Sequence, residues 1–597
     1  MCHAPGVRRA GDAARLLGHA GPSLITRLVL LELAAAVLPL AVIGVIGILV
    51  GRVAGDAAIA WPLAGLSLLL FLQQAIGPFR AAVAYRITRR VDGFVRAQVM
   101  ELANRSLGLA PLEDPTTLDR LELAGGTIDP FWGASPGGAA VAVIALGGRY
   151  LQVAGAAALL ARLSVPVACG LTAVVLLTHH RSLRWNRRRL LAIRGNHAAG
   201  RSSRYTSGLA NTPGPAKEVR LFGVLDWLEH RFRDQWAEVS GTRLGPWRWA
   251  STRVTALLVA LTPVVALAFV VVARTGVEDE VDARSLAVAL QAAIVLFSLL
   301  FDHRQDDAYQ LEFGLEALDT LRVLRDTIDS PGVDGTADAA ELPRELIRFD
   351  GVHFAYPGDG REVFAGLDLT ISAGTSLAIV GGNGAGKTTL VKLLARLQEP
   401  QAGRILVDGV PVEELDPVSW RRRLAVIFQD FVRYELPASD NVGFGGISRR
   451  GDLEALDGAA ARAGALGVVH RLPSGWATPL SRQFVGGADL SGGEWQRIAL
   501  ARALFAVEAG AGVLVLDEPT ANLDVRAEAA LFEDFLDLTR GLTTILISHR
   551  FSTVRHADRI CVLDGGRVVE DGSHDDLVAA GGRYAEMFLL QAERFRD

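Results

Sequence analysis

The sequence predicts two parts of different fold class: a polytopic α-helical membrane domain with six transmembrane helices, fused to an α/β domain built around a phosphate-binding loop. The chain has 597 residues, more than the roughly 250–300 at which single cores stop growing. Its mean hydropathy is +0.28, and the apolar excess lies in the first half. The second half holds a G-x-x-x-x-G-K-T sequence between a strand pattern and a helix pattern.

The overall composition excludes several classes of protein. The 61 basic and 65 acidic residues nearly balance, which argues against a nucleic-acid partner that needs a basic face. The charged fraction is 21% and the hydrophobic fraction 50%, so the chain is not intrinsically disordered. The three cysteines lack the spacing of a zinc site or a disulfide framework.

The first domain is predicted from its apolar stretches, several of which reach the roughly 20 residues that cross a bilayer. A single stretch could be a buried core helix, but so many in one half favour membrane spans. The first is about twice as long as the apolar core of a signal peptide, so we expect it to stay in the protein. The stretches are Leu28–Val50, Ile59–Ile76, Gly137–Leu163, Ser164–Thr178, Val254–Ala273 and Leu286–Phe301.

The distribution of arginine predicts the orientation of these spans. Arginines crowd the segments between spans two and three and between spans four and five, whereas the loop at 278–282 is acidic. Because positive charge stays inside, we expect both termini and both long loops to be cytoplasmic. Turn clusters at Glu113–Thr116 and Thr212–Pro215 interrupt these loops, whose flanks have helical periodicity. The predicted domains are a tail at 1–27, the membrane domain at 28–328, a linker at 329–343 and a nucleotide-binding domain at 344–597.

Polar residues inside membrane spans cost free energy to insert into the bilayer, and they tend to be functional. Arg149 is the strongest candidate, because it interrupts an otherwise apolar run. It could meet an anionic substrate, or it could extend its side chain toward the interface or bond a neighbouring helix. The other candidates are Gln73, Gln74, Gln152 and Gln291.

The second domain contains a phosphate-binding loop directly after a short apolar strand pattern. Glycines let backbone N–H groups turn toward phosphate, and the helix that follows adds a favourable dipole. Lys387 would reach the β- and γ-phosphates of a nucleotide, and Thr388 would bind Mg²⁺. The candidate loop residues are Gly381, Asn383, Gly384, Gly386, Lys387, Thr388 and Thr389.

A second apolar strand pattern ends in two carboxylates, Asp517 and Glu518. Asp517 suits the metal shell of a P-loop enzyme, and Glu518 is placed to polarise an attacking water. The alternative is that these residues only cap a helix.

Leu490–Gln496 resembles the signature motif of ABC transporter ATPases, and it lies between the phosphate-binding loop and the Asp-Glu strand. The resemblance implies ATP and Mg²⁺ as cofactors, with Thr388, Gln429 and Asp517 on the metal. It also implies an adenine-stacking Tyr356, a Q-loop Gln429, a D-loop Asp524 and a switch residue His549. Glu518, His549, Lys387 and Gln429 would be catalytic, and the signature residues Ser491, Gly492 and Gly493 would bind nucleotide. The sequence departs from the common pattern at Glu494 and at Ala521–Asn522.

In this family the signature of one ATPase domain completes the site of another, so the resemblance implies a half-transporter that dimerises. A homodimer is expected, and a heterodimer stays open. Six spans with helical extensions resemble the type IV exporter architecture, in which two cytoplasmic turns couple the domains. The candidates for these turns are Asp114–Thr117 and Thr212–Ala216, and the alternative is that both are ordinary loops. We expect no N-terminal peptidase domain and no C-terminal regulatory domain.

The function that the resemblance implies is ATP-driven export of an amphipathic small molecule, lipid or peptide. The protein would be a multi-pass protein of a bacterial cytoplasmic membrane, in contact with membrane lipid and not with nucleic acid. One alternative is an importer built on the exporter fold, for example for siderophores. An alternative of another class is a non-transporting ABC ATPase, which the apolar stretches oppose.

Overall fold

The computed structural model describes residues 11, 13–105, 108–125, 135–194, 197–241, single positions between 259 and 274, 282–301, 305–328, 335–357, 360–518 and 541–593. The chain divides into two compact units, of which the first comprises Met1–Arg105 and Leu112–Asp329. The second comprises Ser106–Pro111 and Ser330–Asp597. Each unit is described by itself below.

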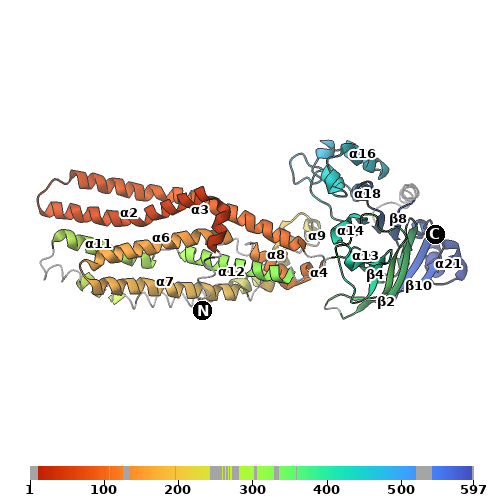
Figure 1. Cartoon of the computed structure of the whole chain (residues 1–597), viewed down its shortest axis with the longest axis horizontal. Coiled ribbons are helices and arrows are strands. Elements are labelled where there is room, and N and C mark those ends of the chain that lie inside the picture. The colour runs from red at the N-terminus through yellow and green to blue at the C-terminus, as the bar shows by residue number, and fades with distance from the viewer. Residues whose placement is uncertain are drawn as a thin grey trace. The chain divides into compact units, whose positions relative to one another are not determined.

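The first unit is helical, and its long helices are coloured red to green in Figure 1. Helix α2 packs on α3 and α6, and α11 packs on α2, α6 and α7. The long helices are α2 (Pro22–Ala54), α3 (Ala60–Arg105), α6 (Pro136–Ala161), α7 (Val165–Arg194), α11 (Ala283–Phe301) and α12 (Gln305–Ile328). The shorter ones are η1 (Leu17–Ala20), α4 (Ala110–Glu113), α5 (Pro115–Ala124), α8 (His197–Asn211) and α9 (Ala216–Leu221).

Three of the described helices, α2, α3 and α6, are long and apolar enough to cross a membrane. The apolar parts of α7 and α11 form shorter helices, Val165–Thr178 and Ala283–Ser298. The fifth predicted span, 254–273, lies mostly outside the described residues. Five of the apolar stretches are therefore helical, and the count of six membrane spans stays a prediction.

The predicted continuation of span two beyond its apolar part is confirmed, because α3 is one helix of 46 residues. The first predicted breaker cluster is a junction in which Asp114 alone separates the short helices α4 and α5, and the second is a turn. Asp114 caps α5 by accepting hydrogen bonds from the backbone N–H groups of Thr116 and Thr117, and hydrogen bonds from these threonines lower the pKa of Asp114 to about 2. Residues 212–215 form the turn between α8 and α9.

A buried acidic residue, Glu32, lies on α2 inside the first predicted span. Its side chain is 6% exposed, and a carboxylate oxygen lies 3.4 Å from the Arg80 guanidinium on α3. A Cβ atom on Gly148 of α6 would lie 3.3 Å from the Glu32 carbonyl oxygen. Glu32 interrupts an apolar run as Arg149 does, so the sequence could have marked it as a candidate, but nothing local in the sequence identifies Arg80 as its partner.

The second unit contains two sheets. A four-stranded antiparallel sheet has the order β2-β1-β4-β5, and a six-stranded sheet has the order β10-β9-β3-β8-β7-β6. The strands of the first sheet are β1 (Leu346–Ala355), β2 (Glu362–Ser372), β4 (Ala402–Val407) and β5 (Val410–Pro411). Those of the second are β3 (Ser376–Gly381), β6 (Leu424–Ile427), β7 (Val513–Asp517), β8 (Thr543–Ile547), β9 (Arg559–Asp564) and β10 (Arg567–Gly572).

Apolar side chains from both sheets form one core with α13. A second core joins β6, β7 and the helices that surround α18. The helices of this unit are α13 (Lys387–Leu394), α14 (Pro417–Arg422), α15 (Ala438–Gly443), α16 (Leu453–Arg462), α17 (Leu466–His470), α18 (Gly492–Glu508), α20 (Phe551–Val554), α21 (His574–Ala580) and α22 (Arg583–Glu593), with short turns η2 (Val412–Glu414), η3 (Ile447–Arg449) and η4 (Gly475–Ala477).

The parallel register of the larger sheet positions the site. Strands β3 and β7 both pair with β8, so that Ile547 lies opposite Ile379 on one side and Asp517 on the other. The carboxyl ends of parallel strands meet at one edge of the sheet, where α/β folds bind ligands. The phosphate-binding loop, the Asp-Glu pair and the segment after β8 therefore emerge together.

Candidate nucleotide-binding site

The phosphate-binding loop joins β3 to α13 and depends on two glycines. Gly381 and Gly386 have φ angles of +157° and +98°. Residues other than glycine rarely adopt these backbone angles. A Cβ atom on Gly386 would lie 2.7 Å from the Phe364 ring. A Cβ on Gly381 would lie closer still to the Leu563 carbonyl oxygen. Both positions therefore require glycine, for space as well as for conformation.

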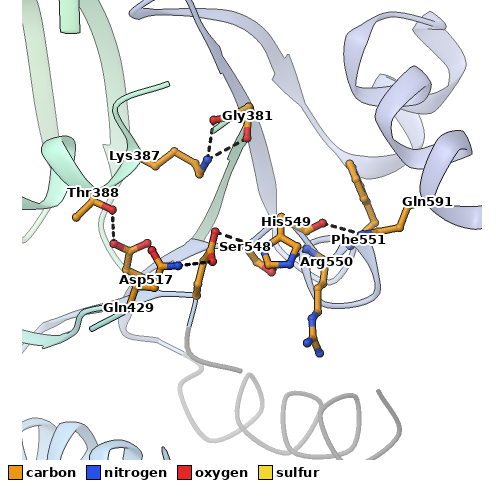
Figure 2. A network of polar contacts seen from close by, with 12 residues as sticks. Gly381, Lys387, Thr388, Gln429, Asp517, Ser548, His549, Arg550, Phe551 and Gln591 are labelled. Carbon is orange, nitrogen blue, oxygen red and sulfur yellow. Dashed lines mark hydrogen bonds and ion pairs between the residues drawn. The ribbon is translucent and has the colours of Figure 1, made fainter. Parts of the chain in front are cut away.

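Lys387 is the first residue of α13. Its ammonium group donates to the carbonyl oxygens of Gly381 and Gly382, at 2.9 and 3.0 Å (Figure 2). Burial lowers the pKa of Lys387, opposed by the charges of Glu518 and Asp517. The lysine thus places a partly desolvated positive charge at the loop, beside a helix N-terminus that favours anions.

Thr388 and Asp517 bring two oxygen ligands together from α13 and β7. The Thr388 hydroxyl donates to the Asp517 carboxylate at 2.7 Å. Burial raises the pKa of Asp517 while this hydrogen bond lowers it, and the net direction is upward. A hydroxyl beside a buried carboxylate is the kind of donor set that Mg²⁺ uses in nucleotide sites, so these residues fit the predicted metal.

Glu518 directly follows β7 and has a φ angle of +48°. Non-glycine residues held in this region cluster at functional sites and store of order 1–3 kcal/mol of strain. The Glu518 N–H donates to the Ile547 carbonyl oxygen at 2.9 Å. This backbone contact holds the residue against the end of β8.

Two further predicted residues meet the Glu518 side chain. The Gln429 amide donates to one carboxylate oxygen at 3.1 Å, and His549 Nδ1 lies 3.3 Å from the other (Figure 2). Glu518 is 16% exposed, whereas His549 is 57% exposed. The predicted base is therefore held between two side chains that come from separate segments of the sequence.

Tyr356 follows β1 and lies beside the phosphate-binding helix. Its hydroxyl is 3.1 Å from the Thr389 hydroxyl, and the Lys392 ammonium lies 5.3 Å from the centre of its ring. Phe354 supports the ring in an edge-on contact at 5.0 Å. The aromatic residue is thus fixed near the loop, as a base-stacking role requires.

The signature residues begin helix α18. Ser491 caps this helix, and Glu494 completes a capping box in which each residue bonds the backbone N–H group of the other. Glu494 also accepts from Arg471 at 2.8 Å. Hydrogen bonds from Ser491 and Arg471 lower the pKa of Glu494. Glu494, which departs from the family pattern, therefore holds a carboxylate in a fixed position beside Ser491.

The structure brings Lys387, Thr388, Gln429, Asp517 and His549 together around Glu518. Asn383 and Gly384 lie in the same loop, and Gly492 and Gly493 form the first turn of α18. Asp524 and the rest of the predicted D-loop lie outside the described residues. The catalytic and binding roles themselves stay predictions.

Two residues that the sequence did not mark hold the segments that follow His549 and Gln429. Gln591 of α22 makes hydrogen bonds to the backbone on both sides of Arg550, directly after His549. Arg502 of α18 donates to the Asn441 carbonyl oxygen at 2.7 Å and lies 4.9 Å from the centre of the Tyr434 ring. Neither is marked by a local pattern, because each acts on a segment distant in sequence.

Residues 364–521 match the family model described as "ABC transporter". The chain carries an ABC transporter ATPase domain. Among curated proteins, it is 39% identical to an ATP-dependent lipid A-core flippase of Bordetella avium over 48% of this chain and 47% of that protein. It is 41% identical to the flippase of the same name from Alkalilimnicola ehrlichii over 42% of this chain and 41% of that protein. The chain thus spans about half the length of the curated relatives it matches.

A solved structure extends the likeness to the membrane part. The structure of a bacterial Atm1-family ABC exporter with ATP bound has a TM-score of 0.68 and 25% identity to this chain, and the match covers 96% of this chain and 98% of that one. The ABC domain sequence and this shared fold together show an exporter-type architecture, in which apolar helices and an ABC ATPase domain are fused in one polypeptide. The predicted fold class is confirmed at this level.

Proposed function

We propose that this protein is one half of an ATP-driven exporter that moves an amphipathic, lipid-like molecule out across the cytoplasmic membrane. The observation that carries the proposal is the meeting of Lys387, the Thr388–Asp517 pair and Glu518 at one sheet edge. The exporter fold over 96% of the chain links this site to a helical membrane domain. The names of the flippase relatives favour a lipid-like substrate over a peptide.

Hydrolysis of ATP at this site would follow from the positions of the side chains. The loop amides and Lys387 would bind the phosphates, and Tyr356 would stack on the base. Mg²⁺ held by Thr388, Asp517 and Gln429 would neutralise phosphate charge. Glu518 would accept a proton from the attacking water, and His549 and Gln429 would hold its carboxylate in position.

A second copy of the chain would supply the missing contacts. Ser491 and Gly493 start a helix of 17 residues, and a helix N-terminus favours binding of an anion such as the γ-phosphate. The family resemblance brings this end of α18 to the nucleotide of a partner subunit, so we propose a homodimer with two complete sites. The arginine distribution favours cytoplasmic termini and ATPase domains.

Transport in inside-out membrane vesicles tests the direction. Export predicts ATP-dependent accumulation of a fluorescent phospholipid analogue or amphipathic dye inside the vesicles. Uptake by whole cells without accumulation in vesicles would favour an importer. In parallel, compounds that stimulate ATP hydrolysis by the protein in lipid nanodiscs would narrow the substrate class.

A further inference from the structure

The side chain of Gln591 bridges the backbone of the segment that carries His549. The Gln591 Nε2 group donates to the His549 carbonyl oxygen at 3.0 Å. Its Oε1 atom accepts from the Phe551 N–H group, also at 3.0 Å. One amide therefore satisfies one peptide group on each side of Arg550, as Figure 2 shows.

The helix that carries Gln591 is also held by side-chain packing, in which Phe551 itself takes part. The Phe551 ring contacts Tyr584 and Phe588 of α22, with ring centres 5.1 and 5.8 Å apart. Tyr584 is fully buried, and His574 of α21 lies 2.8 Å from its hydroxyl. The Gln591 amide thus projects from a helix that aromatic packing already fixes. Its side chain therefore loses little conformational entropy when it binds the segment.

The segment between β8 and α20 is short. Only Ser548, His549 and Arg550 separate Ile547, the last residue of β8, from Phe551. These two hydrogen bonds restrain φ and ψ of Arg550 and fix the peptide plane between His549 and Arg550. That plane contains the His549 Cα, the atom from which the imidazole side chain leaves the backbone. The imidazole lies 3.3 Å from Glu518, so a small rotation of this backbone would change that contact.

We propose that Gln591 is a positioning residue for ATP hydrolysis, which holds the switch histidine through the backbone. The role rests on the proposed ATPase function of the site. Gln591 itself has no assigned contact with nucleotide. Its loss should therefore lower kcat and leave the KM for ATP nearly unchanged, because the phosphate-binding loop and Tyr356 are on other segments.

The substitution Gln591→Glu tests this, because the only heavy atom that it changes is the amide nitrogen, which becomes an oxygen. An ionised glutamate can still accept from the Phe551 N–H, but it cannot donate to the His549 carbonyl oxygen and would repel it. A protonated glutamic acid can do both, as glutamine does. We expect kcat of the full-length variant in nanodiscs to fall about tenfold at pH 7.5. Repulsion from the His549 carbonyl oxygen should raise the pKa of the introduced carboxyl above the ordinary value of about 4.3, so the ratio of variant to wild-type kcat should rise as the pH falls toward 5.

Two variants control the interpretation. Gln591→Met has similar length and removes both hydrogen bonds. It should therefore lower kcat at every pH, and kcat relative to wild type should not rise at acid pH. The same variant also controls for titration of the nearby His574. Leu590→Ala alters the neighbouring side chain, which is 59% exposed, and should keep wild-type kinetics. Wild-type kcat in Gln591→Glu and Gln591→Met would overturn the proposal, as would a parallel loss of ATP binding. A wild-type protein without ATPase activity would instead overturn the proposed function.

Discussion

The Thr388 hydroxyl lies 2.7 Å from the Asp517 carboxylate, although the two residues are 129 positions apart in the chain. The contact joins the start of α13 to the end of β7, and it exists because β3 and β7 flank β8 and all three strands run parallel. A buried carboxylate and a hydroxyl at this edge are the basis of the proposed metal site. The first prediction concerns this pair.

Replacing Asp517 with asparagine should separate metal binding from folding. The variant keeps the shape and loses the charge, so magnesium-dependent hydrolysis should fall at least 100-fold. Because burial raises the pKa of Asp517, ionising it costs stability in the folded protein. That cost is absent below the ordinary pKa of about 3.9 and grows as the pH rises through the folded pKa.

The Asp517→Asn variant should consequently be more thermostable than wild type without nucleotide, and by a larger margin at pH 7.5 than at a pH near the ordinary aspartate pKa of about 3.9. Scanning fluorimetry of the full chain in EDTA measures this margin. A variant that is less stable at both values would show that the ionised carboxylate stabilises the fold.

Glu518→Gln should stop turnover while ATP still binds. General-base catalysis contributes about 10²–10⁴-fold, and the amide cannot accept the proton from water. Phosphate release and nucleotide binding should be measured on the same preparation. Glu413→Gln, an exposed position in η2, is the matched control and should retain wild-type turnover; equal rates for the two variants would refute the assignment of the base.

Gly386→Ala should destabilise the second unit and abolish nucleotide binding. The left-handed backbone and the close Phe364 ring both oppose a side chain, and together they should cost about 1–3 kcal/mol. Gly451→Ala has open space around the new methyl group and should behave like wild type. Denaturant unfolding compares them, and equal stability would show that the loop accommodates a Cβ.

Arg80→Ala should leave Glu32 buried without its charged partner. Breaking a buried pair typically costs about 3–5 kcal/mol, and replacing both charges costs less. The double variant Glu32→Gln, Arg80→Ala should therefore recover much of the thermal stability that the single variant loses. If the double variant were no more stable than Arg80→Ala, the 3.4 Å contact would not be a stabilising pair.

Glu494→Gln restores the residue common in the signature motif and should be nearly neutral. Glutamine can still accept from the Ser491 N–H, so the helix cap survives, and the exposed ion pair with Arg471 is worth less than about 1 kcal/mol. ATPase rates within a factor of two of wild type are expected. A loss of tenfold or more would show that the carboxylate itself takes part in the reaction.

Local sequence predicted the parts of this protein whose chemistry is local. The loop at 381–389 requires a strand, then glycines, then the start of a helix. These features follow one another in the sequence, so each can be recognised there. The resemblance to the family then supplied Gln429 and His549, which spacing alone would not join to Glu518.

The remaining contacts depend on the tertiary fold. Gln591 reaches the segment after β8 from a helix about 40 positions later, and Glu32 meets Arg80 across two helices. Neither pairing can be recognised from the sequence, because many other glutamines and arginines have the same local surroundings. The predicted D-loop, with Asp524, lies outside the described residues.

The most direct test of the central proposal is the movement of a headgroup-labelled fluorescent lipid in proteoliposomes that contain the full chain. With Mg²⁺ and ATP on the side of the ATPase domains, label should move to the opposite leaflet in the wild type. It should stay in place in the Glu518→Gln variant, which still binds ATP. Equal movement by both proteins, or movement without ATP, would contradict an ATP-driven exporter.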